Sequence, residues 1–357
     1  MAHLFIPGPT DVAPEVLAAQ THRMIGHRSP ACSDLFARIE PRLKRVFQTE
    51  RRVFITASSG SGLQEAALRN TVRGRALVCV GGAFAERWFE IALANGLAAD
   101  RLDVAWGEPH DPQQVAEAVR RGAYDAVAIV HNESSTGVAN PVAEVAAAVR
   151  RVSPDTLLLV DAVSSAGGVD LQPDAWGIDV LLTSSQKCLA LPPGLAFAAV
   201  SDRTLERAAA IPQRGWYFDF ILLDRYLQQH TTPATPAISL LYALDAQLDR
   251  ILAEGLPARF ARHARMAEMT QTWALDHFDL LAPQGFRSKT VTAIKNAPRI
   301  DVAALNAHLA AHDMAIAGGY GALRETTFRI GHMGEIQPAD VERLLSAIDD
   351  YLASKHV

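Results

Sequence analysis

Short apolar runs alternate with amphipathic segments through the middle of the chain, between residues 51 and 200. Most of these runs consist of Val, Ile, Leu, Ala and Phe, which is typical of strands that a parallel sheet buries on both faces. They lie at residues 51–57, 75–82, 101–106, 124–131, 156–162, 179–183 and 195–200. Helical patterns separate several of them, at residues 62–72, 85–96, 112–120 and 141–152. This alternation predicts an α/β domain with a doubly wound, mainly parallel seven-stranded sheet flanked by helices.

The pattern changes after about residue 236. Two long amphipathic helices are expected at residues 239–255 and 258–278. The tail then has a compact α+β pattern, with alternating strands and helices at residues 289–294, 301–311, 326–330 and 338–353. A chain of 357 residues exceeds what one hydrophobic core usually supports. We therefore expect a large domain over residues 16–252 and a small C-terminal α+β domain over residues 253–357.

Charge and cysteine content argue against several kinds of partner and site. The formal net charge is -5 and both signs are spread along the chain, so neither nucleic acid nor an anionic membrane is an expected partner. No apolar stretch approaches the ~20 residues of a membrane span, and the N-terminus lacks a signal-peptide pattern. Cys32, Cys79 and Cys188 are isolated, so neither a disulfide framework nor a metal site is expected. A reducing compartment, the cytoplasm, is favoured.

Two of the polar segments that follow the apolar runs could bind a ligand, because ligands bind beyond the carboxyl ends of parallel strands. Residues 58–62, SSGSG, precede a helix whose free amides suit a phosphate, and glycine allows the backbone to approach closely. An ordinary helix N-cap loop is the alternative, since the Walker lysine is absent. Residues 131–137, HNESSTG, supply small hydroxyl donors, although a polar turn would have the same composition.

Two charged residues also stand where apolar strands end. Asp161 could hold a cationic ring nitrogen or a metal, or could cap the next turn. Lys187 lies between apolar segments, where burial disfavours the charged amine and frees it for Schiff-base chemistry. A lysine that reaches solvent is the alternative. A phosphate cradle, a carboxylate, hydroxyl donors and a desolvated lysine in one site together indicate pyridoxal 5'-phosphate (PLP).

The sequence resembles fold-type I PLP-dependent enzymes of class V, in particular the alanine–glyoxylate and serine–pyruvate aminotransferase group. The resemblance runs nearly end to end, through FIPGPTDVAPEV, SSGSGLQEAALRN, HNESSTG, LLLVDAVSSAGG, GIDVLLTSSQKCLALPPG and FRIGHMG. It implies a homodimer with active sites at the subunit interface. It also implies an N-terminal segment, residues 1–15, that contributes to the active site and the dimer.

Carried over by position, the resemblance implies how the chain would hold PLP. Ser61 and Gly62 would bind the phosphate, with help from Gln186 beside the Schiff-base lysine, Lys187. Leu63 stands where some relatives carry histidine, which removes a polar contact near the phosphate.

The resemblance also assigns the residues around the ring and the substrate. Phe84 would stack on the pyridine ring, although a core residue at a helix start is the alternative. Ser134 would lie at or near the ring hydroxyl, and Asp161 would pair with the ring nitrogen. Arg329 would grip the substrate α-carboxylate with its planar fork, and Gly8 would line the substrate pocket through its backbone.

The partner subunit would also touch the phosphate, through the segment at residues 230–236. The family's tyrosine and threonine fall on Thr231 and Ala234, so Thr232 and Thr235 are the candidate substitutes. Arg28 and Arg324 are candidates for a second carboxylate clamp, and no other arginine is identified for that role.

The predicted reaction is ping-pong transamination from a small amino acid, alanine or serine, to a 2-oxo acid such as glyoxylate or pyruvate. Lys187 would serve as the general base once it is displaced from the cofactor. Alternatives on the same fold are an aspartate- or phosphoserine-type aminotransferase and a desulfurase or lyase. An alternative of another class is a PLP-binding protein without turnover.

Overall fold

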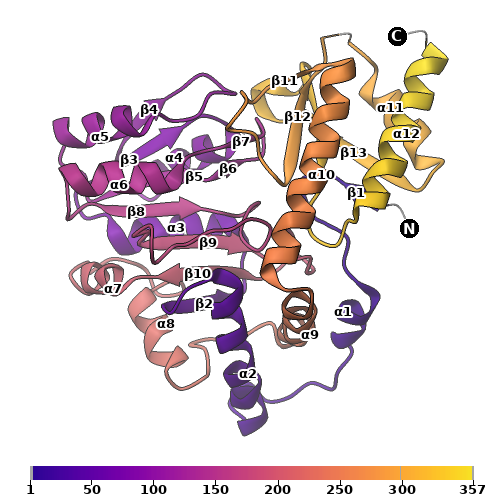
Figure 1. Ribbon diagram of the computed structural model, residues 1–357. Helices are drawn as coiled ribbons and strands as arrows, with labels where there is room; N and C mark the ends of the chain where they lie inside the picture. The colour runs from indigo at the N-terminus through magenta and orange to yellow at the C-terminus, as the bar shows by residue number, and fades with distance from the viewer. Residues whose placement is uncertain (1–2, 298, 356–357) are drawn as a thin grey trace.

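The larger part of the chain is built on a seven-stranded sheet (Figure 1). The computed structural model describes residues 3–297 and 299–355. In spatial order the strands of this sheet are β2 (Arg52–Thr56), β10 (Ala196–Val200), β9 (Val180–Ser184), β8 (Leu157–Asp161), β5 (Ala126–Val130), β3 (Arg75–Val80) and β4 (Ala98–Asp103). Strand β10 pairs antiparallel with both β2 and β9, and the other pairings are parallel. The predicted mainly parallel seven-stranded sheet is confirmed.

One strand of this sheet lies earlier in the chain than its sequence pattern suggests. The expected strand at residues 101–106 is instead β4, which pairs with β3 from Arg75 opposite Ala98 to Val80 opposite Asp103. Strand β4 is at the sheet edge and exposes part of its length. A strand exposed in this way needs no continuous apolar run, so its bounds follow from pairing with β3 rather than from hydrophobicity.

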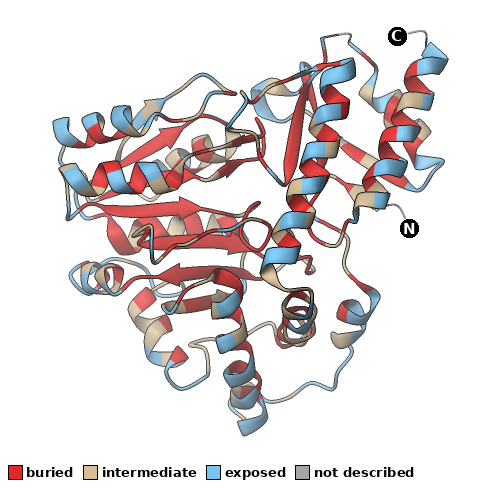
Figure 2. Cartoon of the chain, in the orientation of Figure 1, coloured by how far each residue is buried: buried red, intermediate tan, exposed pale blue. Residues whose placement is uncertain are grey.

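Helices cover both faces of the seven-stranded sheet, most of whose strands are buried (Figure 2). Alternate strand residues belong to two separate cores. Val53 packs into one core and Phe54 into the other, as the two-residue repeat of a strand requires. The first core is closed by α1 (Pro14–Ala19), α2 (Pro30–Phe47), α5 (Pro112–Arg121), α6 (Val142–Val152) and α9 (Ile238–Glu254). The second is closed by α3 (Gly60–Thr71), α4 (Ala83–Ala94), α7 (Asp202–Ala209) and α8 (Phe220–Leu227).

A second sheet lies with the C-terminal helices at the other end of the molecule (Figure 1). Its strands, in spatial order, are β1 (His3–Phe5), β13 (Met314–Gly318), β14 (Thr327–Gly331), β12 (Val291–Lys295) and β11 (Asp279–Leu280). The helices around it are α10 (Leu256–His277), α11 (Val302–Ala310), α12 (Pro338–Lys355) and the short 3₁₀ helix η1 (Gly321–Leu323). A separate hairpin joins β6 (Asn132–Glu133) to β7 (Val138–Ala139).

The N-terminal strand is the unexpected member of the second sheet. Strand β1 pairs parallel with β13, so the first residues of the chain join a sheet formed otherwise by residues after 278. A three-residue strand has no recognisable period of its own, and the pairing depends on a partner more than 300 residues away. After β1 the chain returns to the carboxyl edge of the larger sheet, where Thr10 contacts the segment after β9.

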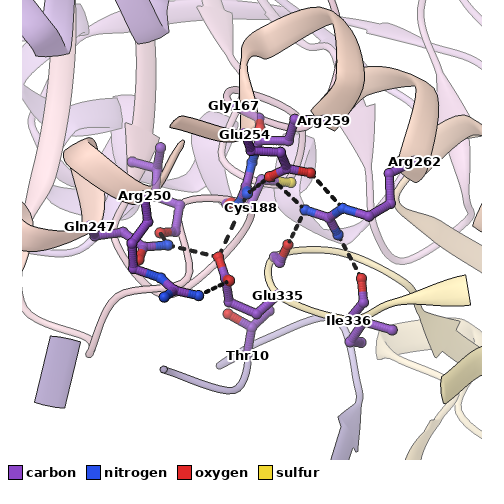
Figure 3. A network of polar contacts seen from close by, with 12 residues as sticks. Thr10, Gly167, Cys188, Gln247, Arg250, Glu254, Arg259, Arg262, Glu335 and Ile336 are labelled. Atoms are coloured by element: carbon purple, nitrogen blue, oxygen red, sulfur yellow. Dashed lines mark hydrogen bonds and ion pairs between the residues drawn. The ribbon is translucent and has the colours of Figure 1, made fainter. Parts of the chain in front are cut away.

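A buried arginine joins helix α10 to the larger sheet (Figure 3). Arg259 is only 1% exposed and donates to the carbonyl oxygens of Gly167 and Cys188, at 3.0 and 2.7 Å. Its guanidinium also pairs with Glu254 of α9 at 2.7 Å, and Arg262 binds the same carboxylate at 2.6 Å. The peptide segment that carries Cys188 is therefore anchored to helix α10, which also contacts β11 and β12 of the second sheet.

Among the helices at residues 3–297 and 299–355, none combines the length and the hydropathy that crossing a bilayer would require.

Candidate active site

A cavity of about 230 Å³ lies at the carboxyl ends of the parallel strands. It brings together the polar segments that follow β2, β5, β8 and β9, as well as the start of helix α4. Its wall consists of Ser59, Gly60, Ser61, Gln64, Phe84, Arg87, Val130, Asn132, Ser134, Asp161, Val163, Ser164, Ser184, Gln186 and Lys187. Segments far apart in the sequence thus form one site, because the carboxyl ends of parallel strands share one sheet edge.

Lys187 follows β9, and its amine points to the N-terminal segment. Nζ donates to the carbonyl oxygen of Pro7, and the backbone of Gly8 lies directly against the lysine side chain. Thr10 anchors the lysine main chain, because its hydroxyl donates to the Lys187 carbonyl at 3.1 Å. Burial, reinforced by the nearby Arg329 guanidinium, lowers the pKa of the Lys187 amine to about 8. About a tenth of the amine is therefore uncharged and nucleophilic at pH 7, far more than for an ordinary lysine.

Asp161 ends β8 and lies on the wall of the same cavity. Its Oδ1 accepts the backbone N–H of Val163 at 2.8 Å, and its Oδ2 accepts Nε2 of Gln64 at 2.6 Å. Burial raises the pKa of this carboxyl to about 6, while the two hydrogen bonds act in the opposite direction. The group is thus mainly a carboxylate at neutral pH, and a cationic partner in the cavity would stabilise that form.

The Ser/Gly loop ends in the N-terminus of helix α3, with Ser59 in an extended conformation before Gly60. Gly60 and Ser61 line the cavity, and a Cβ at Gly60 would come within 2.5 Å of Val163 Cγ2. Gly62 lies outside this lining, since its amide donates to the Ser59 carbonyl and a Cβ there would meet Ser58 and Phe218. Each helical residue turns by about 100°, so only part of the first turn faces the cavity.

Hydroxyl and amide groups cover the wall after β5. Ser134 Oγ donates to Ser164 Oγ at 2.6 Å, and Asn132 Nδ2 donates to the same Ser164 oxygen at 2.7 Å. The sequence pattern and the resemblance point to Ser134 but do not single out Asn132 or Ser164. The segment VDAVSS placed Ser164 close to Asp161 in the chain, and that proximity was the available signal.

Phe84 lies in the first turn of α4, where the buried Glu133 carboxylate accepts its amide at 3.2 Å. Its ring stacks on Tyr320, with centroids 5.4 Å apart and planes 7° apart. Arg87, one turn further along α4, donates to the Tyr320 hydroxyl at 2.8 Å. The stacked pair of Phe84 and Tyr320 therefore joins helix α4 of the larger domain to the loop between β13 and β14. Arg87 adds a cation to the cavity wall.

Arg329 on β14 is 6% exposed and is positioned by main-chain oxygens rather than by an acid. Its Nη1 donates to the Ser134 carbonyl at 3.1 Å and its Nε to the Gly318 carbonyl at 3.0 Å. No ion pair to Arg329 forms within residues 3–297 and 299–355. A buried guanidinium without an acidic partner suits a carboxylate ligand.

The wall of this cavity carries buried polar atoms that lack partners. Within the part of the chain that the structure describes, Gln64 Oε1, Ser184 Oγ and Gln186 Oε1 make no hydrogen bond, and all three residues line its wall. Buried polar groups are normally satisfied, so unpaired ones on one wall indicate a polar ligand. The donors, the carboxylate and the amine together fit a phosphorylated, cationic aromatic aldehyde, which is the chemistry of PLP.

Comparison with known proteins is consistent with this geometry. The family described as Aminotransferase class-V matches residues 14–344. The chain belongs to the class V aminotransferases. It is 38% identical to an uncharacterized aminotransferase of Methanocaldococcus jannaschii (97% of this chain, 91% of that one) and 34% identical to an L-aspartate–glyoxylate aminotransferase of Paracoccus denitrificans (94% and 87%). A crystal structure of an alanine–glyoxylate aminotransferase from Nostoc sp. superposes with a TM-score of 0.92 at 31% identity, covering 98% of this chain and 95% of that one.

This class V aminotransferase therefore has a fold-type I architecture and is a transaminase, as the sequence predicts. A desulfurase would need a reactive cysteine, and Cys188 does not meet that need. The thiol is fully buried, it donates to the Ser164 carbonyl at 3.3 Å, and burial raises its pKa to about 12.

The two arginines considered for a second carboxylate do not reach this cavity. Arg28 donates to Thr231 and to the carbonyl oxygens of Thr232 and Pro233. The side chain of Arg324 is 82% exposed. The arginine on the cavity wall is Arg87, which the sequence pattern had not distinguished because it lies within a helix, whereas Arg329 is not among the wall residues.

Thr232 and Thr235 lie apart from the Lys187 cavity of their own chain. They line a separate hollow with Trp216 and Tyr217, whose side chains are among the exposed large hydrophobic ones. The Thr232 hydroxyl donates to the Ala234 carbonyl at 2.7 Å. A role at a phosphate would therefore concern the site of another subunit.

Proposed function

We propose that this aminotransferase binds PLP through Lys187 and moves an amino group from a small amino acid to a 2-oxo acid such as glyoxylate or pyruvate. The placement of Lys187 and Asp161 on the wall of one polar cavity carries the proposal, and three buried polar atoms of that wall have no partner among the described residues. When bound, PLP withdraws electrons from the substrate Cα through its ring.

The residues of the chain have distinct tasks in this reaction. Asp161 would hold a proton on the ring nitrogen, and the amides of Gly60 and Ser61 together with the Gln186 side chain would bind the phosphate. Phe84 would cover the ring, and Ser134 would interact with its hydroxyl; both residues line the cavity. The Lys187 amine, once released from the cofactor, would take the proton from the substrate Cα as a general base and give it up again as a general acid. Its lowered pKa of about 8 suits a base that works near neutral pH.

Arg329 orients the substrate. Its two main-chain bonds leave the guanidinium free to pair with the α-carboxylate, while Gly8 keeps the backbone close to the reacting amine. A fixed carboxylate places the substrate Cα within reach of Lys187, which is the geometric requirement for proton transfer.

The proposal includes a cytoplasmic homodimer in which Thr232 and Thr235 of one subunit complete the phosphate site of the other. The position of these threonines away from their own cavity supports it, as do the neighbouring exposed Trp216 and Tyr217. Light scattering of the purified protein measures the assembly. A monomer that retains full cofactor affinity would contradict the shared site.

Aspartate is a second candidate amino donor, and Arg87 favours it. The guanidinium lies on the cavity wall, where it donates to the Tyr320 hydroxyl and has no ion pair in the described chain, so it can receive a second carboxylate. The relative from Paracoccus denitrificans is named an L-aspartate–glyoxylate aminotransferase. Replacement of Arg87 by Met separates the donors, because it should lower kcat/KM for aspartate and leave alanine and serine nearly unchanged.

The direct test follows the visible absorption of the protein with PLP. Purified protein should carry a visible band that disappears when alanine, serine or aspartate is added alone and returns with glyoxylate or pyruvate. Phosphoserine tests the remaining alternative donor. Lys187→Ala should lose the lysine-bound band and the exchange. A colourless protein that ignores added PLP, or one whose band no amino donor changes, would refute transamination.

A further inference from the structure

Gln64 is a buried amide that faces the acid of the site. It lies in helix α3, is 2% exposed, and lines the same cavity as Lys187. Its Nε2 donates to Asp161 Oδ2 at 2.6 Å, while its Oε1 makes no hydrogen bond within the described chain. Its main-chain carbonyl accepts the indole N–H of Trp88 at 3.0 Å, which fixes this turn of α3 against α4. A helix that needed only packing at this position would accept an apolar residue of the same length.

The hydrogen bonds to Asp161 define the plane of its carboxylate. Val163 N–H binds Oδ1 from the main chain, and Gln64 binds Oδ2 from the neighbouring helix. The charged groups that act on Asp161 are Glu133, which opposes its ionisation, and Lys187, which favours it. Gln64 is thus the side chain that donates a hydrogen bond to this buried carboxylate. A donor on the charged form favours ionisation, and two donors on different oxygens resist rotation of the group.

We propose that Gln64 is a positioning residue, which keeps the Asp161 carboxylate ionised and aimed at the ring nitrogen of the cofactor. The inference rests on the proposed function for its purpose, whereas the coupling between Gln64 and Asp161 exists in the chain alone. The unpaired Oε1 supports it, because Gln64 is a residue of the cavity wall, where a bound polar ligand can supply the partner that the described chain does not.

The coupling can be measured first without cofactor, through the pH dependence of stability. The Asp161 pKa is raised from 3.8 to about 6, so the folded chain holds this proton more tightly than the unfolded one. The contribution of the group therefore favours the folded state below about pH 4 and is lost as pH rises toward 6. Removal of the Gln64 donor raises the Asp161 pKa further. In Gln64→Met the decline in stability with rising pH should therefore continue to a pH about one unit higher. In an Asp161→Asn background the same substitution should change no pH dependence.

The second measurement is the dissociation constant of PLP as a function of pH, read from the visible band. PLP binding should weaken at low pH, as Asp161 becomes protonated. We call the pH at which this weakening sets in the acid break; in Gln64→Met the acid break should move upward by about one pH unit. Gln64→Glu keeps the shape and adds an acid beside Asp161, so its break should move at least as far. The phosphate of PLP titrates identically with every variant, so only the difference from the parent chain counts.

Gln247 provides a matched control. It is also a buried glutamine, its Nε2 donates to the Glu335 carboxylate at 2.9 Å, and its Oε1 has no partner in the described chain. It lies outside the cavity that contains Lys187. Gln247→Met should therefore lose comparable stability and leave the acid break of PLP binding in place.

The two measurements separate the possible failures. An acid break that stays in place in both Gln64→Met and Gln64→Glu overturns the positioning role, as does an equal shift in Gln247→Met. If Gln64→Met does not fold, the Glu variant decides the same question. If the parent chain does not bind PLP, the proposed function fails, and the cofactor-free pH profiles still determine whether Gln64 controls Asp161.

Discussion

Replacement of Gly8 by alanine tests whether the N-terminal segment positions the reactive lysine. Gly8 has φ +99°, in the region that side chains avoid, and its backbone lies against Lys187. A Cβ at this position would lie 2.6 Å from Lys187 Cδ and 2.7 Å from Nζ. Ordinary contacts between carbon atoms are about 3.5–4.0 Å, so the lysine side chain must move by about 1 Å. The movement would break the bond from Nζ to the Pro7 carbonyl.

Two effects of different size follow from this geometry. The left-handed backbone costs about 1–2 kcal/mol for a residue with a Cβ, which lowers the free energy of unfolding. The lysine can move because its side chain is flexible, so the clash itself should cost little stability. A displacement of about 1 Å at a reacting group lowers a rate by about 10²-fold. We therefore expect Gly8→Ala to be modestly destabilised and to lose far more in the rate of Cα proton transfer.

Gly96→Ala is the matched control, because Gly96 also has a positive φ, +70°, and a Cβ there would meet nothing within 4 Å. Chemical denaturation compares the two stabilities, and rapid mixing with alanine follows the half-reaction of each variant. Similar destabilisation with a slow half-reaction only in Gly8→Ala is the expected result. Equal half-reaction rates in Gly8→Ala and Gly96→Ala would refute the argument that Gly8 sets the position of Lys187.

Three further predictions concern the buried charges. Arg259→Met removes the cation that Glu254 and two carbonyl oxygens share. In denaturant titrations it should lower the free energy of unfolding by about 3–5 kcal/mol. The control Arg343→Met, at an exposed ion pair, should lower it by less than about 1 kcal/mol. A result for Arg259→Met as small as that of the exposed pair would contradict its anchoring role. The rate of PLP capture by cofactor-free protein should rise with pH and level off above about pH 8, because the lowered pKa of Lys187 leaves the amine neutral there. An optimum near pH 10 would mean an unperturbed lysine. Arg329→Lys should raise KM for every α-amino acid by about tenfold or more, because an ammonium cannot replace the planar fork of a guanidinium. The affinity for PLP should change little. An unchanged KM would show that Arg329 does not bind the substrate.

The sequence pattern succeeded where local chemistry and sheet geometry act together. Buried parallel strands require apolar runs, so β5 and β8 were recognisable, and the polar residues that end strands collect at one edge. Asp161 and Lys187 could be proposed for one site on that basis. The pattern failed at β4, whose exposed edge lacks an apolar run, and at β1, which is three residues long.

Residues inside helices were harder to assign than residues in loops. Gln64 and Arg87 lie within α3 and α4, where a polar residue is expected to face solvent. Their direction depends on how each helix is rotated against the sheet, which periodicity fixes only to within one residue or so. The same rotation brings Gly60 rather than Gly62 to the cavity.

By itself, therefore, the sequence determined the fold class and predicted Asp161 and Lys187 as candidates for its chemistry, because these depend on burial patterns and on strand ends. Only the tertiary structure decided how those residues are held. The approach of Gly8 to Lys187, the amide of Gln64 on Asp161 and the anchoring of Cys188 by Arg259 each join segments more than 70 residues apart. Such contacts arise from the packing of helices and returning loops, and no local pattern records them.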